Sequence, residues 1–257
     1  MYNLNPKETV ITITNFISSY IQQSGTKGAV IGLSGGIDST VSAYLSVKAL
    51  GKENVLGILI PEKELTSPED ILDATEVAHI LNIDFSVVDI SEIIKLYYHS
   101  IPEVDKTNRL ATGNLKARIR MSILYYYANL MNRIVVGTGN RTEILLGYFT
   151  KYGDGGVDIE PLGNLFKTQV KQIAHYLEVP YQIIEKSPSA GLWAGQTDED
   201  DLGLSYEIID NILFTLLDKG KPIDYAAEQF GIDKEMISDL MERIDKNQHK
   251  RHVAPTP

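Results

Sequence analysis

Residues 34–40, with the sequence SGGIDST, combine side-chain types that bind phosphate groups. They follow a short apolar run at residues 29–33 and precede a stretch with apolar residues at helical spacing, which predicts a strand, a tight turn and a helix. Glycines in such a turn let backbone N–H groups approach an anion, and the helix dipole adds partial positive charge. The hydroxyls of Ser34 and Ser39 can donate to phosphate oxygens. Asp38 cannot face a phosphate alone, so it implies a bridging divalent cation.

This phosphate loop is not a Walker A motif, because no lysine follows its glycines. It resembles the pyrophosphate loop of the ATP pyrophosphatase group, whose enzymes cleave ATP between the α- and β-phosphates and adenylate a substrate oxygen. An ordinary strand-to-helix turn of small residues is the alternative interpretation. The resemblance implies an activation step and leaves the substrate open.

A second glycine-bearing turn, residues 137–143 (GTGNRTE), follows another apolar run. It misses the dinucleotide-binding pattern, because Thr142 stands where the third glycine belongs. Taken alone, such a turn is commonly only a helix cap. In open α/β sheets, however, ligands bind beyond the carboxyl ends of the strands. Beside the phosphate loop, Glu143 could therefore supply a second carboxylate to a metal held by Asp38.

Three further polar segments carry candidate site residues. Residues 150–158 (TKYGDGGVD) form a glycine-rich charged loop, which is either a surface turn or a lid over a reactive intermediate. Lys167 stands at an expected helix start, where a cation opposes the dipole and needs a compensating anion, for which a phosphate would serve. The basic segment 248–255 (QHKRHVAP) concentrates positive charge in an acidic protein, which favours a ligand role over a disordered tail.

Composition excludes several classes of protein. The net charge of −10, from 34 acidic against 24 basic residues, argues against a large nucleic-acid interface. The absence of cysteine excludes disulfides, cysteine-ligated zinc and a glutamine amidotransferase with a cysteine nucleophile. No stretch approaches 18 consecutive apolar residues, so we expect no membrane span, and the amino-terminal residues lack a signal-peptide pattern. We therefore expect a cytoplasmic protein.

The elements that must position these residues alternate between strands and helices. Apolar patterns predict strands at residues 29–33, 54–60, 85–90 and 133–138, and helices at 5–23, 68–81, 91–98 and 108–131, the last with a possible break at Thr112-Gly113. Strands separated by helices indicate βαβ units. We predict an α/β fold: a Rossmann-like doubly wound parallel sheet with helices on both faces and a helical carboxyl-terminal third. Residues 1–257 are expected to form one domain.

Taken together, the segments resemble the family of ammonia-dependent NAD synthetases almost from end to end. The matching stretches are GLSGGIDS (32–39), GNLKARIRM (113–121), GTGNRTE (137–143), YFTKYGDGGVDIEPLGNLFKTQV (148–170), KSPSAGLW (186–193), QTDEDDLGLSYEIID (196–210) and HKR (249–251). The length is similar to that of the stand-alone form without a fused glutaminase domain, and the absence of cysteine agrees with it.

The resemblance implies that deamido-NAD, ATP and ammonia give NAD, AMP and pyrophosphate. It implies Mg²⁺ held by Asp38 and Glu143, and Asp154 is a candidate to orient or deprotonate ammonium. The ATP-binding residues would be Gly32, Leu33, Ser34, Gly35, Gly36, Ile37, Asp38, Ser39, Thr138, Lys167 and Ser189. The residues that contact deamido-NAD would be Arg118, Lys151, Asp158, His249 and Lys250.

The resemblance also implies a homodimer, and a separate glutaminase could deliver the ammonia. The sequence adds to the dimer prediction, because the segment 124–131 (LYYYANLM) is apolar or aromatic nearly all round and should be buried on more than one face. Two other functions stay open. A tRNA-lysidine synthetase would use a similar loop but needs a basic RNA-binding surface. A nucleotide-sensing module would bind ATP without turnover, and it needs neither two metal-binding carboxylates nor a lid.

Overall fold

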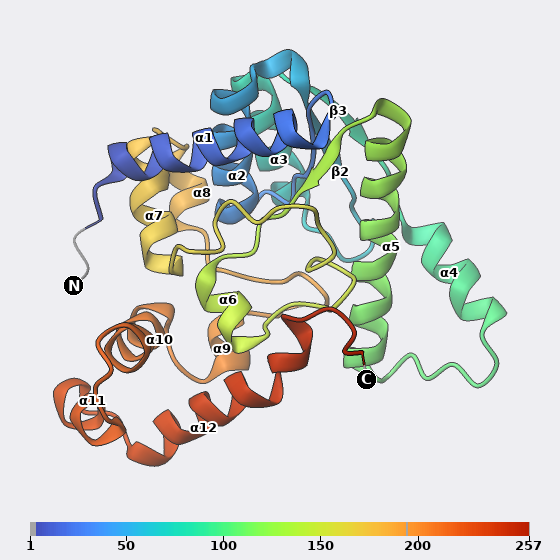
Figure 1. Ribbon diagram of the computed structural model, residues 1–257. Helices are drawn as coiled ribbons and strands as arrows, with labels where there is room; N and C mark the ends of the chain where they lie inside the picture. The colour runs from blue at the N-terminus through green and yellow to red at the C-terminus, as the bar shows by residue number, and fades with distance from the viewer. Residues whose placement is uncertain (1–3, 194, 257) are drawn as a thin grey trace.

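Four short strands form one parallel sheet at the centre of the molecule (Figure 1). The computed structural model describes residues 4–193 and 195–256. The strand order is β3-β2-β1-β4, so β1 lies between β2 and β4 and the chain changes direction across the sheet at this point. The strands are β1 (Ala29–Gly32), β2 (Val55–Leu59), β3 (Asp84–Val87) and β4 (Ile134–Val136).

Helices cover both faces of this sheet, as the doubly wound prediction requires. Along β1 the side chains alternate: Ala29 and Ile31 belong to one buried cluster and Val30 to another. The first cluster packs under α1 (Pro6–Ser24), α2 (Ile37–Leu50), α3 (Pro68–Leu81), α7 (Lys167–Tyr176) and α8 (Tyr181–Glu185). The second packs under α4 (Ser91–Ser100) and α5 (Arg109–Met131). A short 3-10 helix, η1 (Lys52–Asn54), precedes β2.

Most elements lie close to their predicted positions, and local capping explains where α3 begins. Ser67 accepts from the amide of Asp70 (3.0 Å) and begins α3 at the predicted residue. The single long helix predicted over residues 108–131 is confirmed, and the break considered at Thr112-Gly113 is wrong, because α5 runs without interruption through Gly113. A Cβ at Gly113 would lie 3.1 Å from the side chain of Leu192, so this glycine serves close packing. The strands β3 and β4 both end earlier than predicted, at Val87 and Val136.

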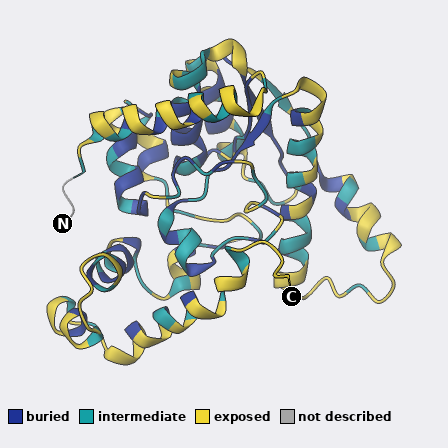
Figure 2. Ribbon diagram, viewed as in Figure 1, coloured by how far each residue is buried: buried dark blue, intermediate teal, exposed yellow. Residues whose placement is uncertain are grey.

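The carboxyl-terminal third is helical, as predicted, and has its own hydrophobic cluster below the sheet in Figure 1. It comprises α9 (Asp198–Leu202), α10 (Tyr206–Leu213), a π-helical turn η2 (Phe214–Asp218), α11 (Ile223–Phe230), α12 (Lys234–Lys246) and a 3-10 turn η3 (Gln248–Lys250). The cluster includes Leu146 of α6 (Arg141–Leu146), the helix that follows β4. Figure 2 shows that buried residues concentrate in the sheet and on the inner helix faces. Among the described residues, no helix is long and apolar enough to cross a membrane.

Candidate active site

The phosphate loop connects β1 to α2 at the carboxyl end of the sheet. The hydroxyl oxygens of Ser34 and Ser39 lie 3.0 Å apart, and the Ser39 hydroxyl donates to the carbonyl of Gly36 at 3.0 Å. Gly35 has a φ of 81°, and a Cβ there would lie 2.4 Å from the carbonyl oxygen of Asp70 at the start of α3. The loop therefore requires glycine at position 35, both for its backbone conformation and for its close contact with α3.

The second predicted loop lies beside the first, because β4 is the neighbour of β1. Asn140 is fully buried and caps α6: its side chain accepts from the amide of Glu143 (3.0 Å), and Glu143 accepts from the amide of Asn140 (3.2 Å). The amide group of Asn140 also donates to Asp38 Oδ1 at 3.1 Å. Asn140 thus joins the two predicted metal-binding carboxylates, a role that the sequence reasoning missed. Its position three residues before a glutamate was the available signal.

Lys167, the first residue of α7, lies between these carboxylates. Its ammonium group is paired with Asp38 Oδ2 and lies 3.3 Å from Glu143 Oε1, and its side chain is 9% exposed. Burial works against the charged form, but the two carboxylates outweigh it and raise the pKa of Lys167. Burial also disfavours the charged form of Glu143, which raises the pKa of its carboxyl, and the ammonium of Lys167 opposes that effect. The anion that Lys167 needs at a helix start is therefore supplied by carboxylates in this structure.

The donor set of this cluster suits a hard divalent cation that also binds phosphate. Asp38 and Glu143 each direct one oxygen at Lys167, while Asn140 holds the other oxygen of each. The described residues contain no cluster of three or more His, Asp or Glu side chains with metal-binding geometry. Mg²⁺ fits two carboxylates nevertheless, because it retains water and takes substrate phosphates as further ligands. The Mg²⁺ prediction stays a prediction, with Asp38 and Glu143 as its protein ligands.

Four of the five residues predicted to contact deamido-NAD form a connected group. Arg118 of α5 donates to the carbonyl of Lys151 (3.3 Å), and the Lys151 ammonium donates to the carbonyl of His249. Lys250 donates to the carbonyls of Gly147 (2.6 Å) and Phe149 (3.0 Å). The basic tail is therefore folded against the glycine-rich loop and the end of α6.

The other predicted site residues lie outside this hydrogen-bonded group. Asp158 accepts from the amide of Val135 in β4 (2.7 Å) and from the hydroxyl of Tyr125 in α5 (3.1 Å). The Asp154 Oδ1 accepts from the amide of Thr150 at 2.9 Å, and burial raises the pKa of this carboxyl although the residue as a whole is exposed. The two residues predicted to give ATP hydroxyl contacts both lie in loops. Thr138 is half-buried and Ser189 is exposed. The Ser189 hydroxyl donates to the carbonyl of Gln196 at 2.7 Å, within its own loop.

Two acidic residues that the sequence reasoning missed lie beside the cluster. Glu160 accepts from the amide of Gly139 at 2.9 Å, and burial raises its pKa to about 8. Asp198 is 4% exposed and accepts from the hydroxyl of Tyr206 at 2.9 Å, and the Tyr206 ring centre lies 5.1 Å from the Lys167 ammonium. Glu160 follows the glycine-rich loop and Asp198 lies in an acidic run, so no local pattern distinguished them.

Comparison with known proteins gives one consistent family. The family model described as NAD synthase matches residues 9–254. A protein of Methanococcoides burtonii named NH(3)-dependent NAD(+) synthetase is 54% identical over 93% of this chain and 90% of its own length. Its counterpart in Methanocaldococcus jannaschii is 51% identical over 98% and 96%.

Solved structures agree with this family. An NH3-dependent NAD synthetase from Campylobacter jejuni has a TM-score of 0.83 and 30% identity, with 99% of this chain and 100% of that chain covered. A structure named NMN synthetase, from Francisella tularensis, has a TM-score of 0.86 and 40% identity, with 99% of both chains covered.

Proposed function

Because the chain belongs to the NAD synthase family and is an ammonia-dependent, NAD-forming ligase, we propose that the cluster at the ends of β1 and β4 activates the substrate carboxylate. The reaction converts deamido-NAD, ATP and ammonia into NAD, AMP and pyrophosphate. A carboxylate does not react with ammonia at neutral pH, so ATP must first convert the nicotinate carboxylate into an acyl adenylate. Ammonia then attacks the acyl carbon, and AMP leaves with the bond electrons.

One observation carries the proposal: the phosphate loop, both carboxylates and Lys167 converge at the point where the strand order reverses. The loop amides and the start of α2 would hold the phosphates that leave as pyrophosphate. Lys167 would neutralise charge on the phosphates during attack at the α-phosphorus. Thr138 and Ser189 would add hydroxyl contacts to ATP.

We also propose Mg²⁺ as the metal, held by Asp38 and Glu143. The ion would neutralise phosphate charge in the transition state. Lys167 now lies between the two carboxylates, so it would have to turn away from them as the metal binds, and the ATP phosphates offer it a new anionic partner. This exchange would make strong metal binding depend on ATP.

For the second step, deamido-NAD would be held by the group that includes Arg118, Lys151, His249 and Lys250, together with Asp158. Asp154 lies in the same loop as Lys151 and Asp158, and burial raises the pKa of its carboxyl, which supports it as the group that orients ammonium or removes its proton. The lid role of this loop would be to keep water from the adenylate.

The similarity to an NMN synthetase favours one alternative substrate, the mononucleotide counterpart of deamido-NAD. The same activation would serve it, because both compounds present a nicotinate carboxylate. The curated relatives named as NAD synthetases are more similar in sequence, which favours deamido-NAD. A cytosolic location and action of residues 1–257 as one domain are further parts of the proposal. A separate glutaminase could supply ammonia.

A homodimer is the proposed assembly. The helices α4 and α5 border a groove of about 350 Å³ lined mainly by apolar and aromatic side chains, among them Ile119, Ile123 and Tyr127. On its rim Tyr126 is 64% exposed, and on the next turn Leu130 is 67% exposed. The sheet of the same subunit thus covers only one face of α5, and a second copy would cover the other.

The test of this function is product formation by the purified chain. We expect AMP and NAD to form in equal amounts from deamido-NAD, ATP and ammonium, and no NAD to form when glutamine replaces ammonium. Nicotinate mononucleotide, offered in parallel, should give a much lower kcat/KM than deamido-NAD. Preference for the mononucleotide would make it the substrate in place of deamido-NAD. Efficient use of glutamine would contradict the ammonia-dependent mechanism.

A further inference from the structure

The first turn of α7 is capped from outside the helix. Its N-cap residue is Phe166, whose side chain cannot accept a hydrogen bond. The amide of Lys167 donates instead to the hydroxyl oxygen of Thr142 (3.0 Å), and the amide of Thr168 donates to Asp210 Oδ2 (2.8 Å). Two of the amides that a helix leaves unpaired at its start are therefore satisfied by residues from α6 and α10.

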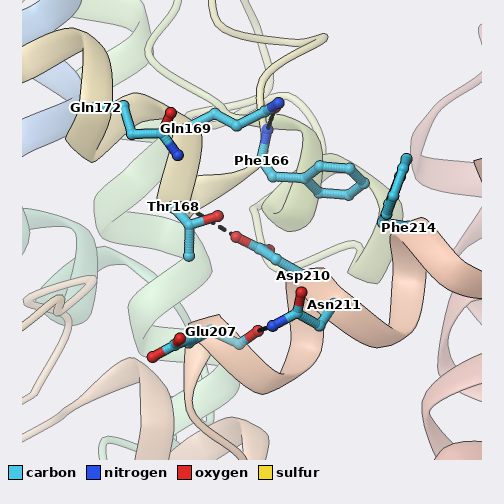
Figure 3. A pocket seen from close by; sticks show the side chains of 8 residues that line it. All are labelled: Phe166, Thr168, Gln169, Gln172, Glu207, Asp210, Asn211 and Phe214. Atoms are coloured by element: carbon cyan, nitrogen blue, oxygen red, sulfur yellow. Dashed lines mark hydrogen bonds between the residues drawn. The ribbon is translucent and has the colours of Figure 1, made fainter. Parts of the chain in front are cut away.

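Asp210 joins both helix starts through its two oxygens. Its Oδ1 accepts from the Thr142 hydroxyl at 2.5 Å, while its Oδ2 holds the amide of Thr168. Figure 3 shows Asp210 reaching from α10 to Thr168, and both residues line a cavity of about 30 Å³. Thr142 and Asp210 are 0% and 5% exposed, so the bond between them does not compete with bulk water.

These contacts bear directly on the active-site cluster. Thr142 immediately precedes Glu143 in α6, and Thr168 immediately follows Lys167 in α7. The carboxylate of Asp210 also lies at the positive end of α7. There it offsets the unfavourable interaction between the Lys167 ammonium and the helix dipole. The separation of Glu143 from Lys167 is thus fixed where α10 meets the two helices.

We propose that Asp210, acting through Thr142 and Thr168, is a positioning residue for adenylation: it holds the starts of α6 and α7 together and thereby sets Glu143 and Lys167 for ATP. The helical third of the chain then contributes to catalysis through this contact. The inference rests on the proposed role of Lys167 in binding ATP.

The test compares Asp210→Asn and Thr142→Val with Thr142→Ser, which keeps the hydroxyl. Asp218→Asn is the matched control, because the Arg141–Asp218 pair (2.9 Å) also joins α6 to the helical third but satisfies no amide of α7. We expect the first two variants to lower kcat/KM for ATP about 10- to 100-fold, on the scale of a misplaced catalytic group. Thr142→Ser keeps the bonding hydroxyl and Asp218→Asn leaves the Asp210 contacts intact, so both should stay within about threefold of the native enzyme.

A second measurement separates positioning from general destabilisation. ATP affinity, in the presence of Mg²⁺ and without deamido-NAD, is measured by calorimetry for Lys167→Met, Asp210→Asn and the double variant, at a temperature where all are folded. If Asp210 acts through Lys167, the double variant should bind ATP no more weakly than Lys167→Met alone. Additive losses would overturn the inference, as would native kcat/KM in folded Asp210→Asn and Thr142→Val. Native ATP affinity in Lys167→Met would instead overturn the proposed role of Lys167.

Discussion

At the scale of single residues, the cluster is a balance between two carboxylates and one ammonium group. Asn140 bonds to both Asp38 and Glu143 and holds them close together. The positive charge of Lys167 offsets the repulsion between their carboxylates. Burial strengthens these interactions, because fewer water molecules screen them. Removing one carboxylate would therefore change charge and geometry together.

We expect Asp38→Asn and Glu143→Gln each to remove most adenylation activity while the protein stays folded. Loss of one ligand to a metal that neutralises the transition state should cost about 3 kcal/mol, on the scale of one strong electrostatic contact. AMP release measures adenylation activity, and circular dichroism shows whether the variants stay folded. The exposed-site change Glu228→Gln is the control, and near-normal AMP formation in both site variants would remove the metal assignment.

Glu160 predicts a pH dependence of stability. Its pKa of about 8 in the folded chain lies above the ordinary glutamate value, so the native state binds the proton more tightly than the unfolded state. Glu160 therefore favours the native state below about pH 4, and this contribution is lost as the pH rises to about 8. Glu160→Gln keeps an acceptor for the amide of Gly139 but cannot ionise.

The free energy of unfolding of Glu160→Gln should exceed that of the native chain by an amount that grows between about pH 4 and pH 8, reaching on the order of 5 kcal/mol. Urea unfolding at several pH values measures it, with Glu228→Gln as the exposed control. A difference that does not change with pH would show that Glu160 titrates normally.

At the scale of elements, the sequence predicted the framework better than the contacts between its parts. The parallel sheet and helices on both faces are confirmed, because apolar periodicity and caps such as Ser67 are local signals. The paired carboxylates could be expected from two loops at strand ends. The local sequence signalled the helix cap at Asn140, but it could not signal the contact of Asn140 with Asp38 or that of Asp210 with Thr142, because these partners are 102 and 68 residues apart. The single long helix at α5 was predicted, and only the break considered at Thr112-Gly113 was wrong, because Gly113 accommodates a distant leucine.

The contact of the phosphate loop with α3 predicts a large effect of Gly35→Ala. Its Cβ would meet the carbonyl of Asp70 at a backbone angle that side chains rarely adopt. Gly231→Ala is the matched control, because its φ is 65° and nothing lies within 4 Å. The control should lose about 1 kcal/mol of stability. Gly35→Ala should lose more and also bind ATP weakly by calorimetry, and equal behaviour of the two variants would refute a role for this contact.

At the scale of the whole molecule, the apolar groove and the substrate-binding group share one helix. Arg118 and Tyr126 both lie on α5, eight residues and thus about 12 Å apart along its axis. A second copy packed on the groove would therefore also approach the deamido-NAD site. An interface of this kind would bury aromatic side chains that now contact water, among them Tyr126 and Tyr97.

We therefore expect Tyr126→Asp to dissociate the proposed dimer and to raise KM for deamido-NAD more than KM for ATP. A carboxylate buried in an apolar interface without a partner is strongly unfavourable, whereas the phosphate loop lies at the ends of the strands and keeps its own contacts. Tyr181→Asp is the matched control, because Tyr181 is 71% exposed on α8, outside the groove. Light scattering across micromolar concentrations gives the mass of each variant. A monomeric native protein with full activity would defeat the dimer, and an unchanged KM for deamido-NAD in a dissociated variant would separate the interface from the substrate site.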